Sequence, residues 1–110
     1  MNLTIDTKKT DSLLEITLNG EIDAYTAPKL RDTIFPLSEK NGIKMIIDLS
    51  GVSYMDSTGL GVFVGVFKNV KANGGHFQLN GLSGRLQRLF EITGLADIID
   101  VNRQIEGEAK

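Results

Sequence analysis

The densest group of side chains that could do chemistry is the run Asp56-Ser57-Thr58-Gly59-Leu60-Gly61. A hydroxyl next to a carboxylate can cap a helix, accept a phosphoryl group or, with a base nearby, act as a nucleophile. An apolar run at 45–49 precedes these residues, and apolar residues at helical intervals follow them. We therefore expect a strand, a loop at 52–55 and a helix from residue 56 or 57 to about 72, with the polar run at the helix N-terminus beyond the strand's carboxyl end.

The first amide groups of a helix lack intrahelical acceptors, and the helix dipole is positive at that end. On residue types alone, we expect Ser57 to cap the helix, so that Ser57→Ala would cost about 1 kcal/mol of stability. A phosphate at the same place would add about 1.5 to 2 negative charges without unfolding the domain, and it would repel the acidic groups of a docked partner. The residues alone leave both roles open.

The composition excludes several kinds of chemistry. The 110 residues include no cysteine and a single histidine, His76, so we expect no catalytic residue, no metal site and no cofactor. The net charge of −2, with scattered Lys and Arg, argues against a nucleic-acid partner. The longest apolar stretch, 60–67, is broken by glycines, and no leader sequence is recognisable. We therefore expect a cytoplasmic protein that binds no membrane.

Two other interpretations of this segment have weaker support. A hydrolase would place a glycine two residues before Ser57, where the chain has Met55, and its single histidine has no evident orienting partner. A nucleotide-binding loop would need a different spacing from that of Gly59, Gly61 and Gly65. We expect these glycines instead to let the helix lie close to the sheet.

The remaining pattern is two half-buried strands followed by alternating helices and strands, which predicts an α/β sandwich. We expect a single domain over 1–110, with a core at about 2–101, a polar tail at 102–110, and about four helices packed on a mixed sheet of four to five strands. The helix that starts near 26–28 should kink or stop at Pro36. The strand at 45–49 should be covered on both faces. Residues Leu60, Val64 and Phe67 should be among the apolar positions of the long helix.

The chain resembles the STAS-domain anti-sigma factor antagonists over about residues 2 to 101. The resemblance is carried by Ser53-Tyr54-Met55 together with the polar run at 56–61, by Gly20-Glu21-Ile22-Asp23 upstream and by the residues 89–95 downstream. The Tyr-Met pair and the run 62–65 most resemble the antagonists of the general-stress (sigma B) branch. The resemblance implies a STAS-like fold and regulation of transcription, in bacteria, by partner switching in a stress response.

In this family, an anti-sigma factor that is also a serine kinase binds either the sigma factor or the unphosphorylated antagonist. It inactivates the antagonist by phosphorylating the motif serine, and a metal-dependent serine/threonine phosphatase restores the active form. The resemblance implies that Ser57 is the phosphoacceptor. Ser57→Ala should then bind but escape regulation, and Ser57→Asp should fold but bind poorly. The implied partner-binding residues are Asp23, Tyr54, Met55, Asp56, Ser57, Thr58, Gly59, Leu60 and Gly61.

Two alternatives stay open at this point. Tyr54 and Met55 are equally compatible with half-buried packing in a loop. The whole chain is also compatible with a STAS signalling-scaffold component or a nucleotide-binding module that does not act on a sigma factor.

Overall fold

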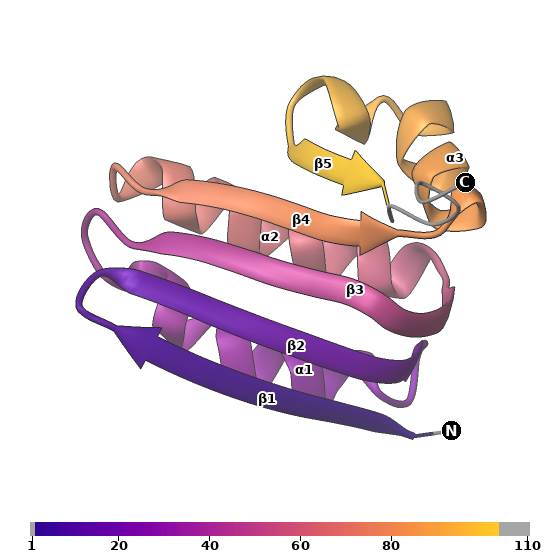
Figure 1. Cartoon of the computed structure of the whole chain (residues 1–110), viewed down its shortest axis with the longest axis horizontal. Helices are drawn as coiled ribbons and strands as arrows, with labels where there is room; N and C mark the ends of the chain where they lie inside the picture. The colour runs from indigo at the N-terminus through magenta and orange to yellow at the C-terminus, as the bar shows by residue number, and fades with distance from the viewer. Residues whose placement is uncertain (1, 104–110) are drawn as a thin grey trace, which may run out of the picture.

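The computed structural model describes residues 2–103, and its elements alternate as the sequence pattern predicts (Figure 1). Each of the first two helices connects two parallel strands, and the third leads from β4 to β5. In chain order, the elements are β1 Leu3–Thr10, β2 Leu13–Ile22, α1 Ala27–Ile34, the 3-10 helix η1 Pro36–Glu39, β3 Lys44–Met55, α2 Ser57–Ala72, β4 His76–Leu82, α3 Gly84–Ile92, the 3-10 helix η2 Leu95–Asp97 and β5 Asp100–Arg103.

The strands form a single mixed sheet in the order β1-β2-β3-β4-β5. Strands β1 and β2 are antiparallel, and every other neighbouring pair is parallel. The predicted α/β class and the mixed sheet of four to five strands are confirmed. The helix count differs from the expected four, because residues 2–103 contain three α-helices and two short 3-10 helices. None of the helices in this range is long and apolar enough to cross a membrane.

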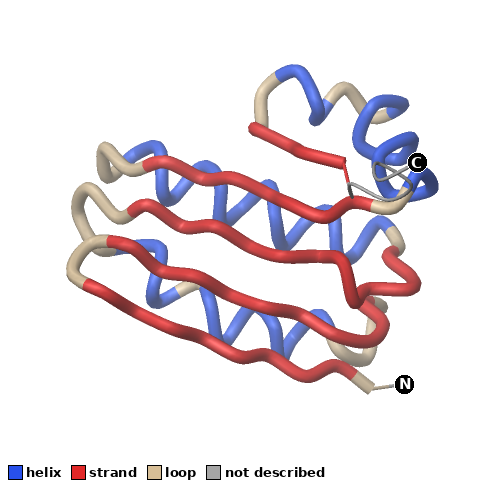
Figure 2. The backbone as a smooth tube through the Cα atoms, viewed as in Figure 1, coloured by secondary structure: helices blue, strands red, loops and turns tan. Residues whose placement is uncertain are grey.

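Helices α1 and α2 lie side by side on the same face of the sheet (Figure 2). Alternate residues of the central strand, Met45, Ile47 and Leu49, are buried beneath them. Ile46, on the opposite face, is only half-buried, and Lys44 beside it is exposed. The expectation that residues 45–49 are covered on both faces is therefore wrong. The crossovers from β2 to β3 and from β3 to β4 run in the same direction across the sheet, so right-handed connections place both helices on one face, which an apolar run by itself does not reveal.

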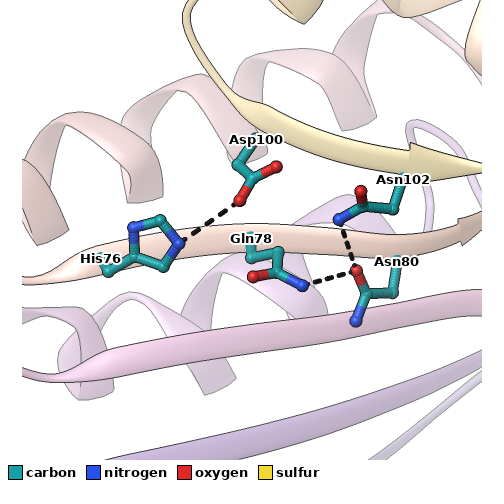
Figure 3. Close-up of polar contacts among 5 residues, drawn as sticks. All are labelled: His76, Gln78, Asn80, Asp100 and Asn102. Atoms are coloured by element: carbon teal, nitrogen blue, oxygen red, sulfur yellow. Dashed lines mark hydrogen bonds and ion pairs between the residues drawn. The ribbon is translucent and has the colours of Figure 1, made fainter.

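The other face of the sheet carries polar side chains, and some of them tie β5 to β4 (Figure 3). His76 Nε2 lies 3.4 Å from Asp100 Oδ2, with both side chains nearly half exposed. Asn80 Oδ1 accepts hydrogen bonds from Gln78 Nε2 at 2.8 Å and Asn102 Nδ2 at 2.9 Å. This use of His76 is structural. Strand β5 continues to Arg103, so the expected tail at 102–110 includes the end of a strand, and its residues 104–110 lie outside the described part.

Strand β3 is longer than predicted. The expected loop at 52–55 is wrong, because Val52 and Met55 pair with Gly20 and Ile22 of β2. The neighbouring strand supplies hydrogen-bonding partners past Gly51, so the glycine does not end β3. As a result, β3 leads into α2 with only Asp56 between them.

The glycines of α2 have different surroundings. A Cβ on Gly59 would lie 2.6 Å from Ile22 Cγ2 and 2.9 Å from Met55 Cγ, so close approach of the helix to the sheet is confirmed there. At Gly61, however, a Cβ would meet no atom within 4 Å, and at Gly65 it would meet the Phe35 ring at 3.2 Å. The packing explanation is therefore wrong for Gly61 and involves a neighbouring side chain rather than the sheet at Gly65.

The face that α2 buries is rotated from the predicted one. Phe63, Val66 and Val70 are fully buried. Of the predicted apolar positions, Leu60 is buried, whereas Val64 and Phe67 are half-buried. In α1, the prediction of a kink or stop at Pro36 is confirmed as a stop: the helix ends at Ile34, and the proline opens η1.

Candidate functional site

The cap of α2 is Asp56 rather than Ser57. Asp56 has an extended backbone, and its Oδ1 accepts hydrogen bonds from the amides of Thr58 at 2.9 Å and Gly59 at 3.2 Å. Its own amide donates to the carbonyl of Ile22 at 3.2 Å, which fixes the helix start against the end of β2. The expectation that Ser57 caps the helix is wrong, because the carboxylate one residue earlier already occupies the capping geometry.

Ser57 is the first residue of α2, and its side chain is exposed. Its hydroxyl takes no part in the cap, so it is available to react. The two amides that bind Asp56 are not available to a phosphate on Ser57. Such a phosphate would therefore be solvated, and it would lie beside a carboxylate. A modification at this position adds negative charge to a surface that is already acidic.

Asp23 holds the turn between β2 and α1. Its Oδ1 accepts hydrogen bonds from the amides of Tyr25 at 2.9 Å and Thr26 at 3.0 Å. The Thr26 hydroxyl in turn accepts from the Asp23 amide at 2.9 Å and donates to the Glu21 carbonyl at 2.8 Å. Asp23 is 6% exposed, and its Oδ2 is buried and has no hydrogen-bond partner among the described residues.

The charge of Asp23 is set by two opposing effects. Burial raises the pKa of its carboxyl group, but the hydrogen bonds donated by the amides of Thr26 and Tyr25, together with the Thr26 hydroxyl, lower it by more. The pKa therefore lies below its ordinary value, and the group is ionised at neutral pH. A carboxylate held out of water is weakly screened, so its negative charge acts on neighbouring surface groups.

A hollow of about 390 Å³ lies between this turn and the end of β3, next to the start of α2. We call it the acidic hollow, because three of its lining residues are Glu21, Asp23 and Asp56. The other lining residues include two tyrosines, Tyr25 at 85% exposed and Tyr54 at 45% exposed. The hollow thus combines negative charge with exposed aromatic rings.

The predicted partner-binding residues fall into three groups. Tyr54, Asp23 and Asp56 line the acidic hollow, and the exposure of Tyr54 counts against simple packing. The exposed residues at the start of α2 are Ser57, Thr58 and Gly61. The buried residues Met55, Gly59 and Leu60 contribute by packing beneath this surface.

Four residues that line the acidic hollow are absent from the predicted partner-binding set: Glu21, Ala24, Tyr25 and Ser53. Glu21 lies in the run 20–23 that carries the family resemblance, so a signal was present for it. Tyr25 stands between Ala24 and Thr26 in a turn, with no periodicity to mark it. The position of Tyr25 depends on the turn that the Asp23 hydrogen bonds hold. Those hydrogen bonds form only in the folded chain, so the sequence gives no sign of them.

Comparison with known proteins identifies the family to which the chain belongs. The model of the STAS domain family matches residues 4–108. The anti-sigma-B factor antagonist of Bacillus subtilis (strain 168) is 53% identical over 107 residues, which are 97% of each chain. The protein of that name from Staphylococcus aureus (strain NCTC 8325) is 44% identical over 108 residues, covering 98% of this chain and 100% of its own length.

Among solved structures, an anti-sigma factor antagonist from Mycobacterium paratuberculosis superposes with a TM-score of 0.82 at 25% identity, covering 92% of this chain and 86% of that chain. The family match and these relatives lead to one conclusion. The chain belongs to the STAS-domain family of anti-sigma factor antagonists.

Proposed function

We propose that the unphosphorylated protein binds an anti-sigma factor that is also a serine kinase, and thereby frees the sigma factor for transcription. The names of the relatives support this antagonist role over a scaffold or nucleotide-binding role. The observation that carries it here is the exposed Ser57, left free by the Asp56 cap at the edge of the acidic hollow. The hollow fits a partner that presents basic groups, because its carboxylates attract cations and its tyrosine rings can stack on them.

Phosphorylation of Ser57 by that kinase would inactivate the protein. A hydroxyl that accepts a phosphoryl group must lie about 3 to 3.5 Å from the γ-phosphorus of the nucleotide. Once transferred, the phosphoryl group fills that space and adds about 1.5 to 2 negative charges facing the nucleotide's own phosphates. Loss of a few kcal/mol of binding free energy corresponds to a hundredfold or greater fall in affinity. That change is sufficient for a switch.

The neighbouring hydroxyls are less suitable acceptors. Ser53 Oγ lies within β3 and donates to the Gly20 carbonyl at 3.4 Å. Thr58 lines a separate groove against α1, beside Ala27 and Val62. Ser57 therefore combines exposure with a hydroxyl that no structural contact needs.

The protein is in this proposal a substrate and not an enzyme. A metal-dependent serine/threonine phosphatase would remove the phosphate from Ser57 and restore the active form. Both reactions would take place in the cytoplasm, where transcription occurs, on a single domain that spans the chain.

The proposal is tested by incubating the protein with the cognate kinase and ATP and locating the phosphate by peptide mass spectrometry. We expect one phosphate on Ser57, none on the Ser57→Ala variant and full labelling of Thr58→Ala. A phosphate on Ser53 or Thr58 would overturn the assignment of the acceptor. Failure of the kinase to bind the unphosphorylated protein would overturn the antagonist role itself.

A further inference from the structure

A second hollow lies on the other side of Tyr54 from the acidic one. It measures about 300 Å³ and separates the end of β3 from α3. Strands β3 and β4 are parallel, so α2 and α3 both begin at the same edge of the sheet (Figure 1). We call this hollow the α3 groove. Its lining residues are Tyr54, Met55, Arg85, Leu86, Arg88, Leu89 and Ile92.

The α3 groove has a composition opposite to that of the acidic hollow. Its floor is apolar, with Met55 and Leu86 buried and Leu89 partly buried. Its charged residues are Arg85 and Arg88, both exposed and three residues apart, so they lie on one side of α3. Tyr54 lines both hollows, which makes them neighbouring parts of one surface.

Two of these residues are locally unfavourable for the fold. Arg85 lies in the first turn of α3, where the positive end of the helix dipole disfavours a cation, and that turn contains no acidic residue. Ile92, the last residue of α3, exposes 75% of its surface. Neither residue stabilises the domain at its position. Residues that break local rules without a structural gain are expected at functional surfaces.

We propose that the α3 groove binds a second segment of the anti-sigma factor kinase, one that presents an apolar side chain flanked by carboxylates. This inference rests on the proposed function and extends its docking surface across Tyr54. The apolar floor and Ile92 provide area to bury, and the two arginines complement the carboxylates. An acidic hollow and a basic groove side by side also fix the orientation of the kinase, because a reversed partner would meet like charges at both. This orientation sets the nucleotide against Ser57.

The test compares two double variants that reverse matched pairs of charges. Arg85→Glu/Arg88→Glu alters the groove, and Lys68→Glu/Lys71→Glu alters an exposed pair of the same spacing in the last turns of α2. The groove variant should keep its melting temperature, since a glutamate in the first turn of α3 favours the helix. Calorimetric titration with the kinase should give a dissociation constant raised about tenfold or more for the groove variant, and within about twofold of wild type for the control.

Kinetics separate a docking role from a chemical one. The groove variant should raise KM for phosphorylation in parallel with the dissociation constant, while kcat and the position of the phosphate on Ser57 stay unchanged. In concentrated salt, the deficit of the charge-reversal variant should shrink, because exposed charges are screened. Ile92→Ser should weaken binding about fivefold, and that loss should persist in salt, because it removes apolar contact.

The outcomes distinguish this inference from the function on which it rests. If the wild-type protein fails to bind the kinase, the proposed function fails and the inference fails with it. If the wild type binds and is phosphorylated on Ser57 while the groove variant matches it, only the α3 groove proposal is overturned. An equal loss in both double variants would indicate unspecific charge attraction and would also overturn it. So would a change in self-association, seen by ultracentrifugation, without a change in kinase affinity.

Discussion

Helices α2 and α3 both follow a parallel strand, and each has a serine at its start, yet the two serines have different tasks. Ser83 has an extended backbone and caps α3 itself, with its hydroxyl accepting the Leu86 amide at 3.2 Å. At α2, Asp56 holds that position, and Ser57 is displaced by one residue into the helix. A cap provided by a neighbour frees a hydroxyl at a helix end without loss of the helix. The difference distinguishes a structural serine from one available for modification.

The largest expected effect is on kinase affinity, and it comes from placing a negative charge at one serine or the other. Ser57→Asp places a permanent negative charge where the phosphate would stand, so kinase affinity should fall about a hundredfold or more. The comparison is Ser83→Asp, which keeps a good capping residue; its charge lies near Arg85 and away from Ser57, so its affinity should fall far less than that of Ser57→Asp. Both dissociation constants can be measured by calorimetric titration. Equal affinities for the two variants would remove the functional distinction between the serines.

The next effect is on stability and concerns the cap of α2. Asp56→Ala leaves two amides without their acceptor and should lower the free energy of unfolding by about 1 to 2 kcal/mol. Urea denaturation, with the slope compared to that of wild type, measures this change. A loss no larger than that of Ser57→Ala would mean that the carboxylate does not carry the cap.

A smaller difference is expected between the two serine-to-alanine variants. Ser83→Ala removes a cap and should cost about 1 kcal/mol, whereas Ser57→Ala should stay within about 0.5 kcal/mol of wild type. The same denaturation experiment serves both proteins. If Ser57→Ala proves the more damaging, its hydroxyl has a structural use and the contrast between the helices is lost.

The smallest effect is on the pH dependence of stability and concerns Asp23. Its carboxylate accepts hydrogen bonds from backbone amides in a turn, as that of Asp56 does at the start of α2. Because the folded pKa of Asp23 lies below the ordinary value of 3.8, its ionised form stabilises the protein above that pH. As pH falls from there through the folded pKa, the unfolded state takes up the proton first, and this stabilisation is lost. The stability gap between wild type and Asp23→Asn should thus be constant from about pH 8 to 5 and shrink in more acidic solution. A gap that widens on acidification would reverse the sign of the effect.

The sequence predicts the start of α2 correctly, but it does not say which residue is the cap. Aspartate and serine are equally good capping residues, and the extended backbone of Asp56 decides between them. The end of β3 was predicted too early, because Gly51 resembles a strand terminator until β2 is seen to pair beyond it. Pairing with a distant strand overrides such a local signal.

The site shows the same limit. Patterns along the chain located the polar run and, through the family resemblance, Asp23 and Tyr54. They did not find Tyr25, whose exposure depends on the turn that Asp23 organises. Nor did they indicate the α3 groove, since its walls come from β3 and α3, which α2 and β4 separate in the sequence.

The central claim is that a phosphate on the free Ser57 switches the docking surface off. It is tested most directly by titrating one kinase preparation with the unphosphorylated protein and with the same protein phosphorylated to completion. We predict that phosphorylation weakens binding about a hundredfold or more while the melting temperature changes little. Equal affinity of the two forms, or unfolding of the phosphorylated form, would contradict the account.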